Sequence, residues 1–271
     1  MKKIRFLAGA AAVAVATASG LMAGCQTNSC CSKKGCAKTM TNKDFYVGGT
    51  FDANGINKGG TFDAAKATQA YFDMFRRFGY PVYPALADAS ITKPGLGFWA
   101  VDFQKGDFVK YGMGGVIWVN EIREQYFGHD IYLLPGQSIA EHRHLSTHIK
   151  AKDQWTGIEY EKDLPCKTES WLVRHGWVWG FSTEGEPNLD KYPEVKAKLS
   201  ALLFEKDPKT GKQFLNCVHV EKWTADGVAH KLAKDESWHF MMGGDEGAIV
   251  SEFANYHDGA GLRFSVPDVG F

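Results

Sequence analysis

The spacing of apolar and polar positions changes near residue 95 of this 271-residue chain. Before that point, between Phe62 and Phe78, apolar and aromatic side chains recur at the interval of an α-helix. Asp63 is a residue type that favours the start of a helix, and Gly79 is one that favours its end. The pattern therefore predicts one amphipathic helix ahead of the main body of the chain.

After residue 95, short aromatic and β-branched runs alternate with glycines. Many short strands at modest spacing are typical of a β-sandwich or a β-barrel. Only residues 192–206 return to a helical period, and we expect one amphipathic helix there. No repeat or linker interrupts this part of the sequence, which favours a single domain over residues 45–271. The expected strands span residues 98–103, 115–120, 130–134, 169–181, 214–222, 247–254 and 262–266.

The first 24 residues have the layout of a secretory signal peptide. Three basic residues precede a charge-free stretch over residues 6–24, and we expect export to the cell envelope or periplasm with removal of this segment. A retained transmembrane helix is the alternative. The sequence LMAGC that ends at Cys25 resembles a bacterial lipobox, so Cys25 is the candidate lipid attachment site and would anchor the protein to a membrane without spanning it. Plain cleavage stays open.

Residues 25–44 are rich in Cys, Ser and Lys and have no apolar period, which predicts a flexible tether. In an oxidising compartment its thiols could form a disulfide, and a metal knuckle is the alternative interpretation. The sequence does not determine the pairing among the cysteines after the candidate lipid site. They are Cys30, Cys31, Cys36, Cys166 and Cys217.

Composition excludes one class of partner. The 31 basic and 31 acidic residues cancel, so the chain lacks the electrostatic footprint of a nucleic-acid-binding protein. A hydrophobic fraction of 44% is ample for a packed core.

Two histidines separated by one residue, His142 and His144, are the strongest indication of chemistry. Side chains two positions apart on a β-strand point to the same face, so both imidazoles can reach one point. A carboxylate and a third imidazole would complete a site for a divalent ion such as Mn²⁺, Fe²⁺ or Zn²⁺. Candidates for both follow later in the chain.

The residues around this pair resemble the first cupin motif. Gly136-x₅-His142-x-His144 resembles its opening, and Glu169-x₆-Gly176 resembles its closing half. In most cupins three or four residues separate the two halves, whereas here 24 do. An insertion that loops out between adjacent strands keeps its ends in place, because a longer loop adds little closure entropy.

Residues 232–240 resemble the second cupin motif, although they lack the usual proline and glycine of its turn. His239 is the histidine of this motif. Glu169 shares a predicted strand face with Trp171, and a Glu among apolar neighbours needs a cation or a donor. The resemblance implies a 3-His/1-Glu site that suits Mn²⁺ best, with Fe²⁺ or Zn²⁺ as alternatives. Its metal ligands would be His142, His144, Glu169 and His239.

Further residues narrow the resemblance to one branch of the cupins. Lys167-x-Glu169 is similar to the Lys-x-Glu of sugar isomerases of the D-lyxose isomerase type, and the tail from Gly243 to Phe264 is similar to the end of those enzymes. The resemblance spans roughly residues 126–268. It implies an all-β-dominated, cupin-type jelly-roll barrel with an N-terminal helical extension and two insertions.

Enzymes of this branch are expected to interconvert an aldose and a ketose, and the resemblance implies a metal-dependent isomerase or epimerase acting on a small sugar. A divalent ion would chelate O1 and O2 of the open-chain sugar, and a base would move a proton between C1 and C2 through an enediol. Glu252 is our candidate for the base, and Lys167 is the candidate donor to a sugar hydroxyl or developing oxyanion. Asp258 and Arg263 are expected to hold the distal hydroxyls.

Two other hypotheses use the same residues. One is a non-catalytic, exported lipoprotein that binds metal or carbohydrate, and the other is an Fe²⁺ cupin dioxygenase. The resemblance is compatible with a homodimer, because cupins commonly associate through strand edges, but no residue of the sequence indicates one. The remaining histidines are interpreted as structural; they are His129, His148, His175, His219, His230 and His257.

Overall fold

The computed structural model describes residues 39–82, 86, 97–153 and 156–270. The expected signal peptide, Cys25 and the three cysteines of the tether lie outside the described residues. From Met40 onward the chain forms one compact unit. Among the described residues, no helix combines the length and the apolar character needed to cross a membrane.

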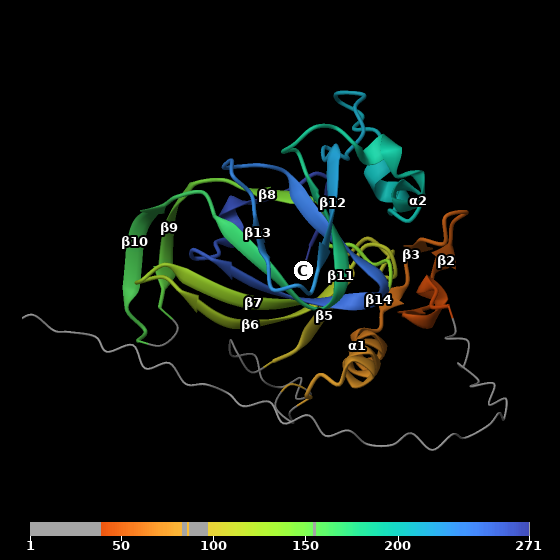
Figure 1. The fold of residues 1–271 in the computed structure, drawn as a ribbon, viewed down its shortest axis with the longest axis horizontal. Helices are drawn as coiled ribbons and strands as arrows, with labels where there is room; N and C mark the ends of the chain where they lie inside the picture. Colours follow the sequence, from red (N-terminus) through yellow and green to blue (C-terminus); the bar gives the residue numbers. More distant parts are fainter. Residues whose placement is uncertain (1–38, 83–85, 87–96, 154–155, 271) are drawn as a thin grey trace, which may run out of the picture. The chain divides into compact units, whose positions relative to one another are not determined.

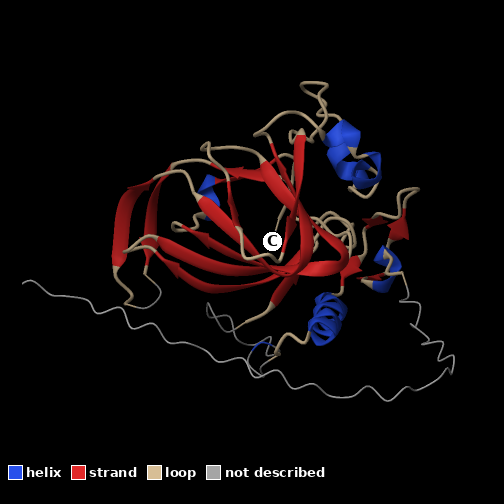
Figure 2. Ribbon diagram, in the orientation of Figure 1, coloured by secondary structure: helices blue, strands red, loops and turns tan. Residues whose placement is uncertain are grey.

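One curled antiparallel sheet of nine strands dominates this unit (Figures 1 and 2). Its main path runs in the order β12-β11-β14-β7-β6-β5, while β13 pairs with β11, and β8 pairs with both β14 and β15. The predicted all-β-dominated jelly-roll class is confirmed. The strands are β5 (Trp99–Val101), β6 (Met113–Glu121), β7 (Tyr126–Leu133), β8 (His142–His144), β11 (Glu169–Ser182), β12 (His219–Thr224), β13 (Ala229–Lys231), β14 (His239–Ala254) and β15 (Leu262–Phe264).

Strands β11 and β14 form the central ladder of the sheet, and a β-bulge interrupts their register next to Gly176. Gly176 has φ +69°, and a Cβ placed on it would lie 2.2 Å from the carbonyl oxygen of Gly247. Only glycine accepts both the left-handed backbone and this close approach. The backbone geometry therefore explains why the residue at the end of the first cupin-like motif is Gly176.

The N-terminal extension packs helix α1 (Ala64–Phe78) beneath the sheet (Figure 1). As predicted, Asp63 caps its start by accepting a hydrogen bond from Lys66 N, and Gly79 ends it in the left-handed conformation. The buried face of α1 contacts the outside of the barrel, and Tyr71 Oη donates to Gln137 Oε1 at 2.5 Å. Short elements precede the helix: η1 (Asn42–Asp44), β1 (Tyr46–Val47), β2 (Thr50–Phe51), β3 (Asn57–Lys58) and β4 (Thr61–Phe62).

The packed body begins before the expected boundary at residue 45. Asn42 is buried, and its side chain donates to Asp107 Oδ1 at 2.7 Å and to the carbonyl of Gly55 at 2.9 Å. These bonds hold the end of the expected tether against the domain.

The single helix expected over residues 192–206 is wrong. The structure has η3 (Leu189–Lys191), α2 (Pro193–Lys196) and η4 (Ala201–Phe204) instead. Ser200 adopts an extended backbone between the last two, accepts a hydrogen bond from Leu202 N and donates its hydroxyl to Asp107 at 2.6 Å. The local cap therefore breaks the helix, although the leucines of the apolar pattern stay buried.

The insertion between His144 and Glu169 folds as a β-hairpin. Strands β9 (Thr147–Lys152) and β10 (Glu159–Leu164) pair with each other at one edge of the barrel (Figure 1). The buried side chains Ile149 and Leu164 pack with Ile122. This pairing returns the chain to the barrel, so the insertion separates the motif halves in sequence without separating them in space.

Two cysteines fall within the described residues. Cys166 and Cys217 are both buried and both free, so these two do not form a disulfide with each other.

Candidate metal and substrate site

Three strands bring the four predicted metal ligands together. His142 and His144 lie on β8, Glu169 begins β11, and His239 begins β14 directly opposite His142 in the register. Their candidate ligand atoms all lie within 4.8 Å of one another. The two histidines therefore point to the same face of β8, as their spacing in the sequence predicted.

Backbone carbonyls orient two of the three imidazoles. The Nδ1 of His142 lies 2.8 Å from the carbonyl oxygen of Ala140, and the Nδ1 of His239 lies 2.9 Å from that of Ser237. A carbonyl only accepts, so each Nδ1 carries a proton, and in the neutral imidazole the lone pair is then on Nε2. This second contact is typical of histidines that bind metal through Nε2.

Glu169 lies between the imidazoles. Its Oε1 is 3.2 Å from His144 Nε2, and its Oε2 is 2.9 Å from His239 Nε2. Both nitrogens are buried and make no well-aligned hydrogen bond within the described chain. A nitrogen lone pair and a carboxylate oxygen are both acceptors, so they cannot form a hydrogen bond with each other. A divalent cation can bind both, and this set of side chains therefore fits a metal ion.

The charges of these groups also suit a cation. Burial, together with the neighbouring imidazoles, lowers the pKa of His142 well below its ordinary value, which keeps its lone pair free. Burial alone would raise the pKa of Glu169, but Lys167 and the imidazoles outweigh it and hold this pKa well below the ordinary value. The set is an ionised carboxylate beside imidazoles that can bind through Nε2.

Lys167 connects this set to Glu252. Its buried Nζ lies 2.6 Å from Glu169 Oε1 and 2.5 Å from Glu252 Oε1, and 4.4 Å above the ring of Phe127. Glu252 Oε2 accepts a longer bond of 3.4 Å from the indole nitrogen of Trp171. The two predicted catalytic residues are thus adjacent to each other and to the four candidate ligands.

Burial sets the proton affinity of Glu252. It raises the pKa of this carboxyl above the ordinary value even though the Lys167 ammonium opposes the shift. A carboxyl with a raised pKa is better matched to proton transfer near neutral pH than an exposed one.

A cavity of about 760 Å³ inside the barrel is lined by Lys167, Glu252 and the candidate ligands other than His239. Its wall contains three of the four candidate ligands, the two candidate catalytic residues, and many apolar side chains. The lining residues are Trp99, Val101, Phe103, Met113, Ile117, Asn120, Phe127, His129, Ile131, Ile139, Ala140, His142, His144, Lys167, Glu169, Glu252, His257, Gly259, Leu262 and Phe264.

His129 and His257, which the sequence pattern indicated to be structural, also line this cavity. His129 faces Glu252 across the β7–β14 register, with 4.0 Å between its Nδ1 and Glu252 Oε2. Burial lowers the pKa of His129 to about 3, so it is neutral at physiological pH. His257 is held by Asn120, whose amide exchanges two 2.9 Å bonds with the His257 backbone. The position of His129 could have been predicted, because it shares one strand face with Phe127 and Ile131.

Asp258 and Arg263, expected to hold the distal hydroxyls, are not among the residues that line the cavity. Arg263 lies between Leu262 and Phe264 on β15, and because both neighbours line the cavity, Arg263 points to the opposite face. Its guanidinium donates to the carbonyl of Ala260 at 2.7 Å. Asp258 accepts from Thr147 Oγ1 at 2.5 Å and caps η5 (Gly259–Gly261), so its carboxylate is used in joining the hairpin to the tail.

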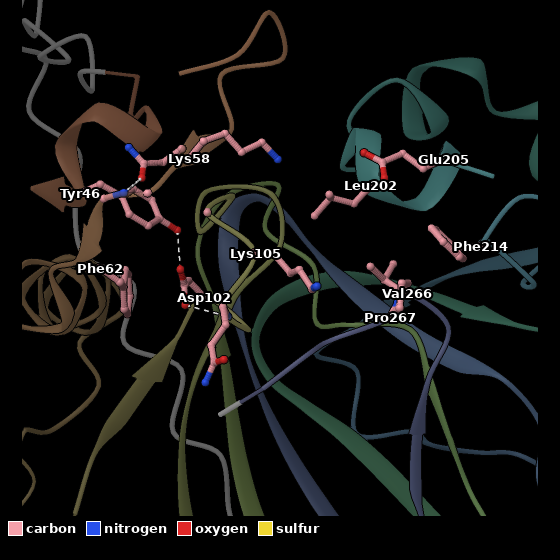
Figure 3. Close-up of a pocket in the computed structure, with 15 residues that line it drawn as sticks. Tyr46, Lys58, Phe62, Asp102, Lys105, Leu202, Glu205, Phe214, Val266 and Pro267 are labelled. Atoms are coloured by element: carbon pink, nitrogen blue, oxygen red, sulfur yellow. Dashed lines mark hydrogen bonds between the residues drawn. The ribbon is translucent and has the colours of Figure 1, made fainter. Parts of the chain in front are cut away.

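A second cavity, of about 580 Å³, lies outside the barrel (Figure 3). It is bounded by the N-terminal extension, the loop after β5, and the C-terminal tail. Tyr46 Oη donates to Asp102 Oδ2 at 2.8 Å, which pairs two of its buried polar groups with each other. None of the predicted site residues lies there.

No family model matches the chain. A D-lyxose/D-mannose isomerase from Thermosediminibacter oceani is 27% identical over 191 residues, which are 69% of this chain and 88% of that protein. Among solved structures, L-ribose isomerase from Cellulomonas parahominis is 12% identical, with 76% of this chain and 92% of that chain covered and a TM-score of 0.44. L-ribose isomerase from Geodermatophilus obscurus is 13% identical, with coverage of 70% and 84% and a TM-score of 0.38. The resemblance to sugar isomerases of the D-lyxose isomerase type, predicted from the motifs, is confirmed by the first of these relatives.

Proposed function

We propose that this protein is a metal-dependent isomerase or epimerase that interconverts an aldose and a ketose. One observation carries the proposal: a buried Lys167–Glu252 pair adjoins a cluster of three imidazoles and one carboxylate, and every one of these groups except His239 lines a single cavity. The similarity to a D-lyxose/D-mannose isomerase supports it.

His142, His144, Glu169 and His239 would hold the cation. The mixed nitrogen and oxygen donors suit Mn²⁺ best, with Fe²⁺ and Zn²⁺ as alternatives. When bound, a divalent cation supplies the Lewis acidity that polarises a sugar carbonyl and acidifies the neighbouring C–H.

Glu252 would move the proton between C1 and C2. Its carboxylate is buried, and contacts with Lys167 and Trp171 fix its orientation toward the cavity. Because one carboxylate can take the proton from one carbon and return it to the other, a single base serves both directions of the reaction.

Lys167 would stabilise the oxygen that gains negative charge as the C–H proton leaves. Its ammonium is desolvated, and two carboxylates raise its pKa, so it stays charged throughout the working pH range. A preorganised buried donor of this kind stabilises developing charge more than water does.

The reaction is tested by incubating metal-loaded protein with a panel of pentoses and hexoses in D₂O and following ketose formation by NMR. Proton transfer through an enediol predicts deuterium at the carbon that receives the proton. Ketose without deuterium would mean that the buried carboxyl returns the proton before it exchanges with solvent, whereas no ketose from any sugar would contradict the proposal. Oxygen consumption in place of ketose formation would favour the dioxygenase hypothesis, and tight sugar binding without product would favour the non-catalytic one.

A further inference from the structure

The wall of the barrel cavity is apolar on one side of the candidate metal ligands. Val101 pairs with Met113 between β5 and β6, and Phe264 pairs with His142 between β15 and β8, which places an apolar surface directly beside the metal-binding cluster. Ile131 follows His129 by two residues on the same face of β7, about 7 Å further along the strand. The apolar side consists of Val101, Phe103, Met113, Ile131, Ile139 and Phe264.

Few polar groups remain in this cavity for the hydroxyls of a substrate. Apart from the candidate ligands, Lys167 and Glu252, the polar side chains among the described lining residues are Asn120, His129, His257 and the indole of Trp99. The amide of Asn120 is bonded to the backbone of His257. The Nε2 of His129 is buried above Gly115, where a Cβ would lie 2.5 Å from it, and the His129 ring stacks on Trp99.

Such a wall would discriminate between substrates by their terminal group. A hydroxyl that is desolvated against Val, Met and Ile without a hydrogen-bond partner is unfavourable, whereas a methyl group in the same position is favourable. The side chains of Val101, Met113 and Ile131 would offer no hydrogen-bond donor to the C6 hydroxyl of a hexose bound with O1 and O2 at the candidate metal ligands.

We propose that the substrate is a 6-deoxyhexose, a sugar whose terminal carbon is a methyl group, seated on the apolar wall formed by Val101, Met113 and Ile131. This inference rests on the proposed isomerase function, and it adds the chemical class of the sugar. In this arrangement the candidate metal ligands, Lys167 and Glu252 contact the C1–C2 end of the sugar, and the apolar wall contacts its C6 end.

The test compares sugars that differ only at C6. Metal-loaded, full-length protein is assayed with L-rhamnose against L-mannose, L-fucose against L-galactose, D-fucose against D-galactose, and 6-deoxy-D-glucose against D-glucose. In the pairs that react, kcat/KM is expected to be about tenfold or more higher for the deoxy member. Equal values, or a preference for the hydroxylated member, would overturn the inference while leaving the isomerase function intact.

A binding measurement keeps the two proposals distinguishable. If no pair reacts, the isomerase function fails, and calorimetry with metal-loaded Glu252→Gln protein decides the remaining question. Tighter binding of the deoxy member, by about tenfold, supports the apolar wall. Equal affinity, or no binding of either member, overturns it.

Substitution of the wall provides an independent readout. Val101→Thr replaces a methyl by a hydroxyl at nearly constant volume, and it is expected to reduce the deoxy preference severalfold. Met113→Gln is a second variant with the same expected direction. Val119→Thr, on β6 but outside the cavity lining, is the matched control and should keep the wild-type preference. An unchanged preference in both wall variants would overturn the inference.

Discussion

Lys167 and Glu252 form a buried ion pair, 2.5 Å between Nζ and Oε1, and Lys167 makes a second pair with Glu169 at 2.6 Å. One ammonium thus separates two buried carboxylates. Without a cation between them, two such carboxylates would raise each other's pKa and disfavour the ionised form of the pair. The lysine therefore has an electrostatic role in the folded protein as well as the proposed role toward substrate.

Replacing Lys167 should reveal both roles. Lys167→Met is expected to abolish sugar isomerisation and to lower the free energy of unfolding of metal-free protein by about 3 kcal/mol, because two buried carboxylates lose their shared partner. Urea unfolding with and without metal measures the effect. A bound cation near Glu169 should recover part of the loss, and equal destabilisation in both forms would contradict this electrostatic account. Lys150→Met, at an exposed ion pair with Glu161, is the control and should change stability little.

Glu252→Gln tests the proposed base. The amide keeps the size of the side chain but cannot accept the C–H proton, so kcat should fall by about 10²–10⁴-fold. Metal content should stay at the wild-type level, because Glu252 is not among the four clustered ligands. Undiminished kcat would remove Glu252 from the base role.

The pH dependence follows from the raised pKa of Glu252. The base acts only when it is deprotonated, so kcat/KM should fall as the pH decreases through this pKa. Because burial raises it above the ordinary value of 4.5, activity should be lost at a higher pH than an exposed glutamate would give. Metal content must be measured at each pH, since protonation of the histidines would also reduce activity. An acid limb at or below the ordinary carboxyl range, with metal retained, would contradict the assignment.

Metal binding is tested by removing single ligands. His142→Ala and Glu169→Gln should each lower the metal content of reconstituted protein and weaken the stabilisation that metal gives wild type, about 2.7 kcal/mol when free metal exceeds Kd a hundredfold. Elemental analysis and thermal unfolding with added Mn²⁺, Fe²⁺ or Zn²⁺ measure both effects. His148→Ala is the control, because this exposed histidine lies on the hairpin with Asp163 and Glu161. Full metal content in both ligand variants would exclude this cluster as the metal site.

Part of the site could be predicted because local periodicity determines it. The His-x-His spacing on β8 is sufficient to place two imidazoles on one face, and the antiparallel pairing of the insertion explains why Glu169 returns beside them after 24 residues. The proximity of Glu252 depends on the β11–β14 register, and the resemblance to known isomerases supplied it. Metal binding by these residues stays a prediction.

Other features depend on tertiary contacts that the sequence pattern does not contain. Arg263 was assigned to the cavity from the resemblance, although the alternation of Leu262 and Phe264 around it favoured the opposite face. His257 follows the last residues of β14, and it reaches the cavity through contacts with the distant Asn120, Phe127 and His144. The break at Ser200 arises from a hydroxyl bonded to Asp107, 93 residues earlier, which no helical periodicity reveals.

The strand that carries Glu169 also provides a stability test. Gly176→Ala should destabilise the protein by about 3 kcal/mol, since it combines a left-handed backbone with a Cβ only 2.2 Å from the Gly247 carbonyl oxygen. Gly211→Ala is the matched control: its φ of +70° is nearly the same as the +69° of Gly176, but no atom lies within 4 Å of the added Cβ. It should therefore cost only the backbone strain, about 1 kcal/mol. Urea unfolding of the two variants isolates the steric contribution, and equal destabilisation would show that the close approach of β11 to β14 does not constrain this position.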